Sequence, residues 1–140
     1  MALASILEVG PSVYCPFGFN IIIYSDCIEF TMEYCQHVSC LTKTIEIDLK
    51  QALLRLHQFK IIHFDIKPDN ICFSPTFNKY VFIDFGLSKL VIENLGERSL
   101  TKFRGSFEYC SSEMALACIS GSAKMVDLYY NDISCLKASV

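Results

Sequence analysis

Basic residues are missing from the first 42 positions of this 140-residue chain, and all twelve Lys and Arg follow that point. They form no run anywhere, and the formal net charge is −3. A surface that binds nucleic acid normally carries clustered positive charge. The sequence therefore predicts no nucleic-acid partner.

Long apolar runs are also missing. The longest apolar stretches, such as FNIII (19–23) and YVFI (80–83), fall far short of the roughly 20 residues that a membrane-spanning helix needs. The first ten residues, MALASILEVG, lack the basic start and the small-residue cleavage site of a signal peptide. These absences predict a chain with no membrane partner.

None of the eight cysteines forms a C-x-x-C pair, which is the spacing that most structural zinc sites show. Secreted disulfide scaffolds are normally shorter and less apolar than this chain. We interpret the cysteines as free thiols that pack as small apolar side chains in a reducing compartment, which predicts a cytoplasmic protein. They lie at positions 15, 27, 35, 40, 72, 110, 118 and 135.

What is present suits one globular domain, since 52% of the residues are hydrophobic and 19% are charged. Residues 2–9 have the pattern of the last turns of a helix, which Gly10 and Pro11 would stop. Residues 19–25 and 27–35 are two apolar runs separated by a polar turn, and they predict a pair of strands.

Residues 44–59 predict a helix, because Ile45, Leu49, Leu53 and Leu56 recur at helical spacing. Either Thr42 or Thr44 could be its N-cap. Further along, we expect strands at 71–73 and 80–84, an irregular segment at 86–112, and helices near 113–119 and 126–137.

The stretch IIHFDIKPDN (61–70) places polar groups between apolar anchors. Pro68 lacks an N–H and disfavours helix at Lys67, so the segment is expected to be a loop. In such a loop the Asp65 carboxylate can accept a hydroxyl proton, and the Lys67 ammonium can neutralise a phosphate. The Asn70 amide oxygen can bind a hard cation.

A second carboxylate, Asp84, stands at the end of the strand expected at 80–84, two residues before Gly86. The glycine allows a sharp turn that would present this carboxylate. Together with an amide oxygen, it would suit Mg²⁺ that bridges nucleotide phosphates.

These segments resemble the protein kinase family. The catalytic loop of that family reads H-R-D-x-K-P-x-x-N and its metal-binding segment reads D-F-G, and this chain has HFDIKPDN (63–70) and DFG (84–86) in the same order. GSFEYCSSE (105–113) is similar to the family's G-T-x-x-Y-x-A-P-E. VDLYYND (126–132) resembles the start of its long buried helix, and FTMEYC (30–35) resembles the strand that ends in the adenine-binding hinge.

The resemblance implies catalytic roles for Asp65, which would accept or orient the substrate hydroxyl proton, and for Lys67, which would steady the γ-phosphate. It implies that Asn70 and Asp84 hold Mg²⁺ and that ATP is the phosphate donor. A Lys at the position of Lys67 points to Ser/Thr kinases, and Ser106 would bond both Asp65 and Lys67.

The resemblance also implies an adenine site. Met32 would be the gatekeeper, the Glu33 carbonyl and the Cys35 N–H would bond the adenine edge, and Cys72 would line the floor of the pocket. For both cysteines, the alternative is a purely structural role as small apolar side chains in the pocket wall.

His63, Phe85 and Asp127 are implied as internal supports, with Asp127 bonding the catalytic-loop backbone. Phe64 stands where the family has an Arg that pairs with a phosphate on the activation segment. We therefore expect basal activity that does not depend on phosphorylation of Ser99 or Thr101 in that segment. Those two residues are equally well interpreted as part of a solvated loop.

The fold implied is α+β: a partial protein-kinase-like fold with the end of the N-lobe, which is a helix end plus two antiparallel strands, and the first part of a mainly helical C-lobe. Residues 1–35 would be the N-lobe remnant with the hinge. Residues 36–140 would be a partial C-lobe with the long helix, catalytic loop, D-F-G, activation segment and start of the buried helix.

Two departures weaken the catalytic interpretation. The chain has no G-x-G-x-x-G, and no Lys precedes Lys43 to hold the α/β-phosphates. Ser111-Ser112-Glu113 replaces A-P-E, and the usual Arg partner of its Glu belongs to a later region. We therefore expect an incomplete kinase domain with exposed apolar faces and weak or no activity alone. The alternative is a pseudokinase-like scaffold or protein-interaction module without catalysis.

Overall fold

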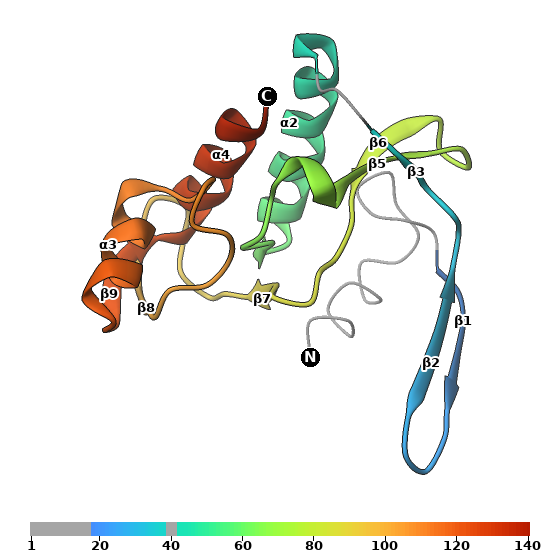
Figure 1. The fold of residues 1–140 in the computed structure, drawn as a ribbon, viewed down its shortest axis with the longest axis horizontal. Coiled ribbons are helices and arrows are strands. Elements are labelled where there is room, and N and C mark those ends of the chain that lie inside the picture. The colour runs from blue at the N-terminus through green and yellow to red at the C-terminus, as the bar shows by residue number, and fades with distance from the viewer. Residues whose placement is uncertain (1–17, 39–41) are drawn as a thin grey trace.

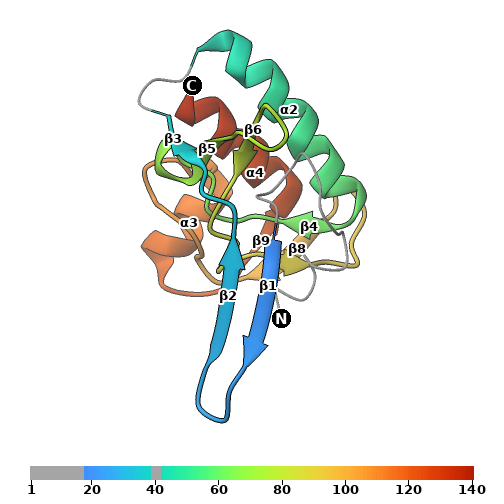
Figure 2. The same ribbon diagram turned by 90° about the vertical axis from the view of Figure 1, so that its right-hand side faces the viewer.

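The first element of the structure, a computed structural model that describes residues 18–38 and 42–140, is a β-hairpin. Strands β1 (Gly18–Ile23) and β2 (Ile28–Met32) pair antiparallel, and the Tyr24 N–H donates to the Cys27 carbonyl across the turn at 2.8 Å. The hairpin projects away from the remaining elements (Figures 1 and 2). Its cross-strand pair Ile23–Ile28 is exposed, as expected for apolar faces without a cover. The helix end expected at 2–9 lies outside the described residues.

Helix α2 (Lys43–Gln58) forms where the apolar spacing predicts it. Of the two candidate caps, Thr42 is the N-cap, because its Oγ1 accepts from the Ile45 N–H at 3.5 Å. The buried face of the helix lies against α4 (Leu128–Ser139), and the two helices run side by side in both views (Figures 1 and 2). Their shared core includes Leu49, Leu56 and Leu136.

A three-stranded sheet in the order β3-β5-β6 begins directly after the polar loop, because its central strand β5 follows that loop in the chain. Its strands are β3 (Gln36–His37), β5 (Ile71–Ser74) and β6 (Lys79–Phe82), and all neighbours are antiparallel. Because Ile71 pairs with Phe82, the residue before β5 and the residue after β6 are neighbours, and the Ile83 N–H donates to the Asn70 carbonyl at 2.9 Å. The sheet therefore brings the loop at 63–70 beside the segment at 83–86.

Short elements complete the loop region. The 3-10 turn η1 (Pro68–Asn70) precedes β5, while β4 (Ile61–Ile62) pairs with β7 (Lys89–Leu90). The segment expected to be irregular also contains β8 (Arg98–Thr101), which pairs antiparallel with β9 (Lys124–Asp127). That expectation was wrong for these strands, because two-residue and four-residue strands in polar sequence are specified by their partners rather than by their own pattern.

Helix α3 (Ser112–Ser120) begins at the N-cap Ser111, whose Oγ accepts from the Met114 N–H. It ends at Gly121, which has a φ of 65°, a conformation that glycine adopts without a Cβ penalty. In the described part of the chain, no helix combines the length and the apolar character that crossing a bilayer requires.

Candidate active site

Three residues to which the resemblance gives a role in the site, Ser106, Asn70 and Lys67, lie around the Asp65 carboxylate. Ser106 Oγ donates to Asp65 Oδ1 at 2.7 Å, which confirms the expected contact between these two residues. Asn70 Nδ2 donates to the Asp65 backbone carbonyl at 2.8 Å and to Oδ2 at 3.3 Å. Lys67 Nζ lies 3.9 Å from Asp65 Oδ2. The carboxylate is thus held from two segments, and an ammonium stands beside it.

Asn70 and Asp84 offer the donor atoms that a hard cation prefers. The Asn70 amide uses its Nδ2 on Asp65, which leaves its Oδ1 as an acceptor, and Asp84 Oδ1 accepts from the Gly86 N–H at 3.3 Å. Asp84 has a φ of 57°, which turns the chain after β6. A Cβ at Gly86 would lie 3.2 Å from Asp84 Oδ1, so glycine leaves room for this carboxylate. The oxygen donors fit Mg²⁺.

His63 is a structural support, as expected. Its side chain is fully buried, its Nε2 donates to the Ile83 carbonyl at 2.9 Å, and its Nδ1 accepts from the Asp65 N–H at 3.1 Å. These two bonds require the neutral ring with the proton on Nε2. Burial lowers the pKa of His63, which agrees with the neutral form. The ring joins the loop at 63–70 to Ile83, the residue after β6, and it also packs against Phe85 at 4.9 Å between centroids.

The carboxylate that holds the backbone of the loop at 63–70 is Asp132, not Asp127. Asp132 is fully buried, and its Oδ2 accepts from the His63 N–H at 2.9 Å while its Oδ1 accepts from the Phe64 N–H at 3.0 Å. His57 Nε2 donates to the same Oδ2 at 3.0 Å. Asp127 instead caps α4, because its Oδ1 accepts from the Tyr130 N–H at 2.9 Å.

A sequence signal for Asp132 existed. Tyr129, Asp132 and Leu136 are spaced three and four residues apart, so they share one helical face. Tyr129 and Leu136 are buried, and a carboxylate on the same face must find donors. The resemblance to the family motif instead implied this role for Asp127, the first Asp of VDLYYND.

The four predicted adenine-site residues come from two neighbouring segments. Met32 ends β2 and is 40% exposed, Glu33 is buried, Cys35 is half-buried, and Cys72 is buried in β5 opposite His37 of β3. The Glu33 side chain accepts from Ser74 Oγ at 2.6 Å. This bond joins the segment after β2 to β5, and it was not predicted from the sequence.

Glu113 has an Arg partner within the chain. Arg98 Nε donates to Glu113 Oε1 at 2.7 Å, so an Arg that sequence analysis did not consider pairs with this carboxylate. Glu113 Oε2 accepts from the Asp127 N–H at 2.9 Å. This backbone bond, followed by the bond from Arg98, lowers the pKa of Glu113. The carboxylate therefore joins β8, α3 and β9.

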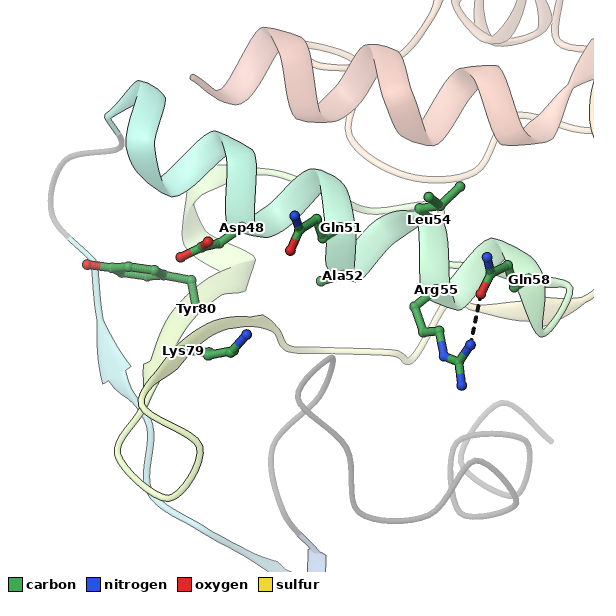
Figure 3. A pocket seen from close by; sticks show the side chains of 8 residues that line it. All are labelled: Asp48, Gln51, Ala52, Leu54, Arg55, Gln58, Lys79 and Tyr80. Carbon is green, nitrogen blue, oxygen red and sulfur yellow. Dashed lines mark hydrogen bonds between the residues drawn. The ribbon is translucent and has the colours of Figure 1, made fainter.

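A cavity of about 310 Å³ lies outside this cluster, between α2 and the start of β6. Figure 3 shows the polar side chains that line it from α2, with Arg55 directed toward Gln58, and Lys79 and Tyr80 from β6. None of the predicted catalytic, adenine-binding or metal-binding residues lines it. Its lining therefore gives it no link to the chemistry around Asp65.

Comparison with known proteins independently identifies the protein kinase family. A family model described as "Protein kinase domain" matches residues 21–132. The human cell division cycle 7-related protein kinase is 33% identical over 75 residues, which cover 46% of this chain and 13% of that protein. The rat mitogen-activated protein kinase kinase kinase 8 is 43% identical over 75 residues, which cover 53% of this chain and 15% of that protein.

Among solved structures, the chain is similar to a kinase of the Cydia pomonella granulovirus. The TM-score is 0.68 at 21% sequence identity, and the match covers 96% of this chain and 50% of the viral one. This likeness confirms the expected fold class, an α+β, partial kinase-like fold. The chain spans about half the length of the viral kinase and less than a fifth of the curated relatives that it matches.

Proposed function

The chain belongs to the protein kinase family, and on this premise we propose that it acts as a protein serine/threonine kinase, or as the middle part of one, with a protein as its substrate. The observation that supports this most is the bond of 2.7 Å from Ser106 to Asp65. It joins the activation segment to the catalytic loop, so the substrate platform and the proton acceptor are held together.

In the proposed reaction, the hydroxyl oxygen of a substrate Ser or Thr attacks the γ-phosphorus of ATP, and the bond from that phosphorus to the β,γ-bridging oxygen breaks. Asp65 orients the hydroxyl and accepts its proton. Lys67, 3.9 Å from Asp65 Oδ2, steadies the negative charge that gathers on the transferred group.

Asn70 and Asp84 would hold Mg²⁺, which neutralises charge on the phosphates when bound. Their position is favoured by the pairing of Ile71 with Phe82, which puts the two residues at adjoining ends of β5 and β6. Met32, Glu33, Cys35 and Cys72 are proposed to contact the adenine. The bond between Glu33 and Ser74 supports a fixed hinge.

We also propose the division at residue 35, with an N-lobe remnant at 1–35 and a partial C-lobe at 36–140. The projecting β1–β2 hairpin is consistent with this boundary. A cytoplasmic location is proposed from the thiols: within the described ranges, Cys27, Cys72, Cys110, Cys118 and Cys135 form no disulfide.

A pseudokinase-like scaffold is the second candidate. Its basis is the sequence itself, which contains no G-x-G-x-x-G and no Lys before Lys43. In a kinase those groups grip the nucleotide phosphates, so a chain that acts without them should transfer phosphate several orders of magnitude more slowly. Binding a partner needs neither group.

The deciding experiment measures nucleotide binding and transfer separately. Thermal unfolding of the 140-residue chain with millimolar ATP and Mg²⁺ should show a rise in Tm, and Asp84→Asn should abolish the rise. Transfer of labelled γ-phosphate is then measured on Ser, Thr and Tyr peptide pools. Asp65→Asn should abolish transfer, while Asp69→Asn, an exposed neighbouring carboxylate, should not. A Tm that ATP leaves unchanged, together with no transfer, would favour the scaffold.

A further inference from the structure

Phe64 occupies a strained position at the centre of the catalytic loop. Its side chain is 2% exposed, and its φ of 72° is unusual for a bulky residue. Residues in this conformation persist only where their surroundings hold them. On one side, Asp132 accepts from the Phe64 N–H at 3.0 Å.

Arg104 holds the other side of Phe64. The Arg104 Cζ lies 5.3 Å from the centroid of the Phe64 ring, which is within the range of a cation–π contact. The same guanidinium donates from Nη1 to the Leu87 carbonyl at 3.0 Å. One side chain therefore contacts both the catalytic loop and the turn that follows Asp84.

The two residues after Arg104 extend this contact. Gly105 has a φ of 110°, and a Cβ there would collide with the Phe64 carbonyl oxygen, so the two backbones touch. Ser106 then donates to Asp65. Residues 104–106 therefore contact residues 64 and 65 in three ways. The Arg104 guanidinium lies over the Phe64 ring, the Gly105 backbone lies against the Phe64 carbonyl, and the Ser106 hydroxyl bonds Asp65.

We propose that Arg104 is a positioning residue that acts through Phe64: it clamps the activation segment and the turn at Leu87 onto the catalytic loop, with no phosphate involved. Its effect on catalysis rests on the proposed kinase function. In a phosphate-controlled loop, the guanidinium belongs to the catalytic loop and its counter-charge must be added. Here the guanidinium comes from the activation segment, and its partners, an aromatic ring and a carbonyl, are already in place.

The chemistry of the partners explains why no added charge is needed. The face of an aromatic ring carries the negative end of a quadrupole, and a carbonyl oxygen is the negative end of a dipole, so both attract a cation. A phosphate elsewhere on the segment would have to displace these contacts to reach Arg104. The clamp therefore works independently of the phosphorylation state of Ser99 and Thr101.

The test is a double-mutant cycle read by amide hydrogen exchange on the 140-residue chain. Arg104→Gln removes the cation, and Phe64→Leu removes the ring but keeps an apolar side chain. Each single change should speed exchange about tenfold at 84–88 and 104–106, and the double change should add little more. Lys102→Gln is the matched control, since it removes an exposed charge two residues away. Equal speeding by Lys102→Gln, or additive effects of the two changes, would overturn the proposal.

A second readout addresses positioning. Arg104→Gln should lower kcat about tenfold at an unchanged KM for ATP, and Arg104→Lys should restore part of kcat because it keeps a cation over the ring. A loss that appears only in KM would contradict the proposal. If the wild-type chain transfers no phosphate, the proposed function fails, and the exchange cycle still decides the role of Arg104.

Discussion

Arg98 and Glu113, fifteen residues apart in the chain, form an ion pair with 2.7 Å between Nε and Oε1. The pair is partly exposed, so its direct contribution to stability is small, about 0–1 kcal/mol. Its importance is positional: Glu113 also accepts from the Asp127 N–H, so strand β8 is anchored to the start of α4 through one carboxylate.

The first prediction concerns acid stability. The pKa of Glu113 is lowered by the Asp127 backbone bond and by Arg98, so its folded pKa lies below its unfolded value. Glu113 therefore stabilises the fold above the unfolded pKa, and this contribution disappears as the pH falls through the folded pKa. Urea midpoints measured at pH 7 and pH 3.5 should differ less for Glu113→Gln than for the wild-type chain. An unchanged difference would contradict the assigned bonds.

The second prediction separates Asp132 from Asp127. Asp132→Ala leaves the His63 and Phe64 N–H groups buried without an acceptor, and we expect a loss of about 3–5 kcal/mol in the free energy of unfolding. Asp127→Ala removes a helix cap, with an expected loss of about 1 kcal/mol. Denaturant unfolding of both variants tests whether Asp132→Ala loses more unfolding free energy than Asp127→Ala. Equal losses would mean that the buried network is not formed as described.

The third prediction concerns thiol reactivity. Cys27 is exposed in the hairpin turn, whereas Cys72 is buried in β5, the central strand of its sheet, and burial raises the pKa of its thiol. Because the thiolate is the reactive form, alkylation of Cys72 at pH 8 should be at least about tenfold slower than that of Cys27. Peptide mass spectrometry after timed labelling gives both rates. The same labelling in strong denaturant is the control and should bring the two rates together.

The fourth prediction distinguishes the two hydroxyls of β8. Ser99 is buried opposite Val126 and its Oγ has no partner among the described residues, while the Thr101 hydroxyl donates to the Lys102 carbonyl. Ser99→Glu should therefore cost about 2–4 kcal/mol of unfolding free energy, and Thr101→Glu less than about 0.5 kcal/mol.

Ser99→Ala serves as the control for this strand. It removes a buried hydroxyl without adding charge and should be neutral or slightly stabilising. If Thr101→Glu destabilised the chain as much as Ser99→Glu, the register of β8 on β9 would be wrong.

The sequence predicted those parts of the fold and the site whose conformation depends on residues close together in the chain. The spacing of Leu49, Leu53 and Leu56 specifies α2, and Pro68 specifies the loop that contains Asp65. The resemblance to the kinase motifs also implied that Ser106 would bond Asp65.

The contacts that could not be predicted join distant segments through single side chains. Arg104 contacts Phe64 and Leu87, and Arg98 contacts Glu113. These contacts depend on how the intervening chain folds back, which no local sequence pattern specifies. The strands β8 and β9 escaped prediction for the same reason, since each is specified by its partner across the pair.

The placement of Asp132 on α4 has a consequence for how the chain acquires its shape. The Asp132 carboxylate accepts hydrogen bonds from the N–H groups of His63 and Phe64, which precede it by 69 and 68 residues. It also accepts one from His57, which precedes it by 75 residues. Contacts over such separations form late in folding, because the entropy cost of closing a long loop comes before the stabilisation that the contacts provide. On a ribosome, which makes the chain from the N-terminus, the catalytic loop emerges well before the residue that fixes its backbone. Its final geometry is therefore completed only after α4 has been synthesised.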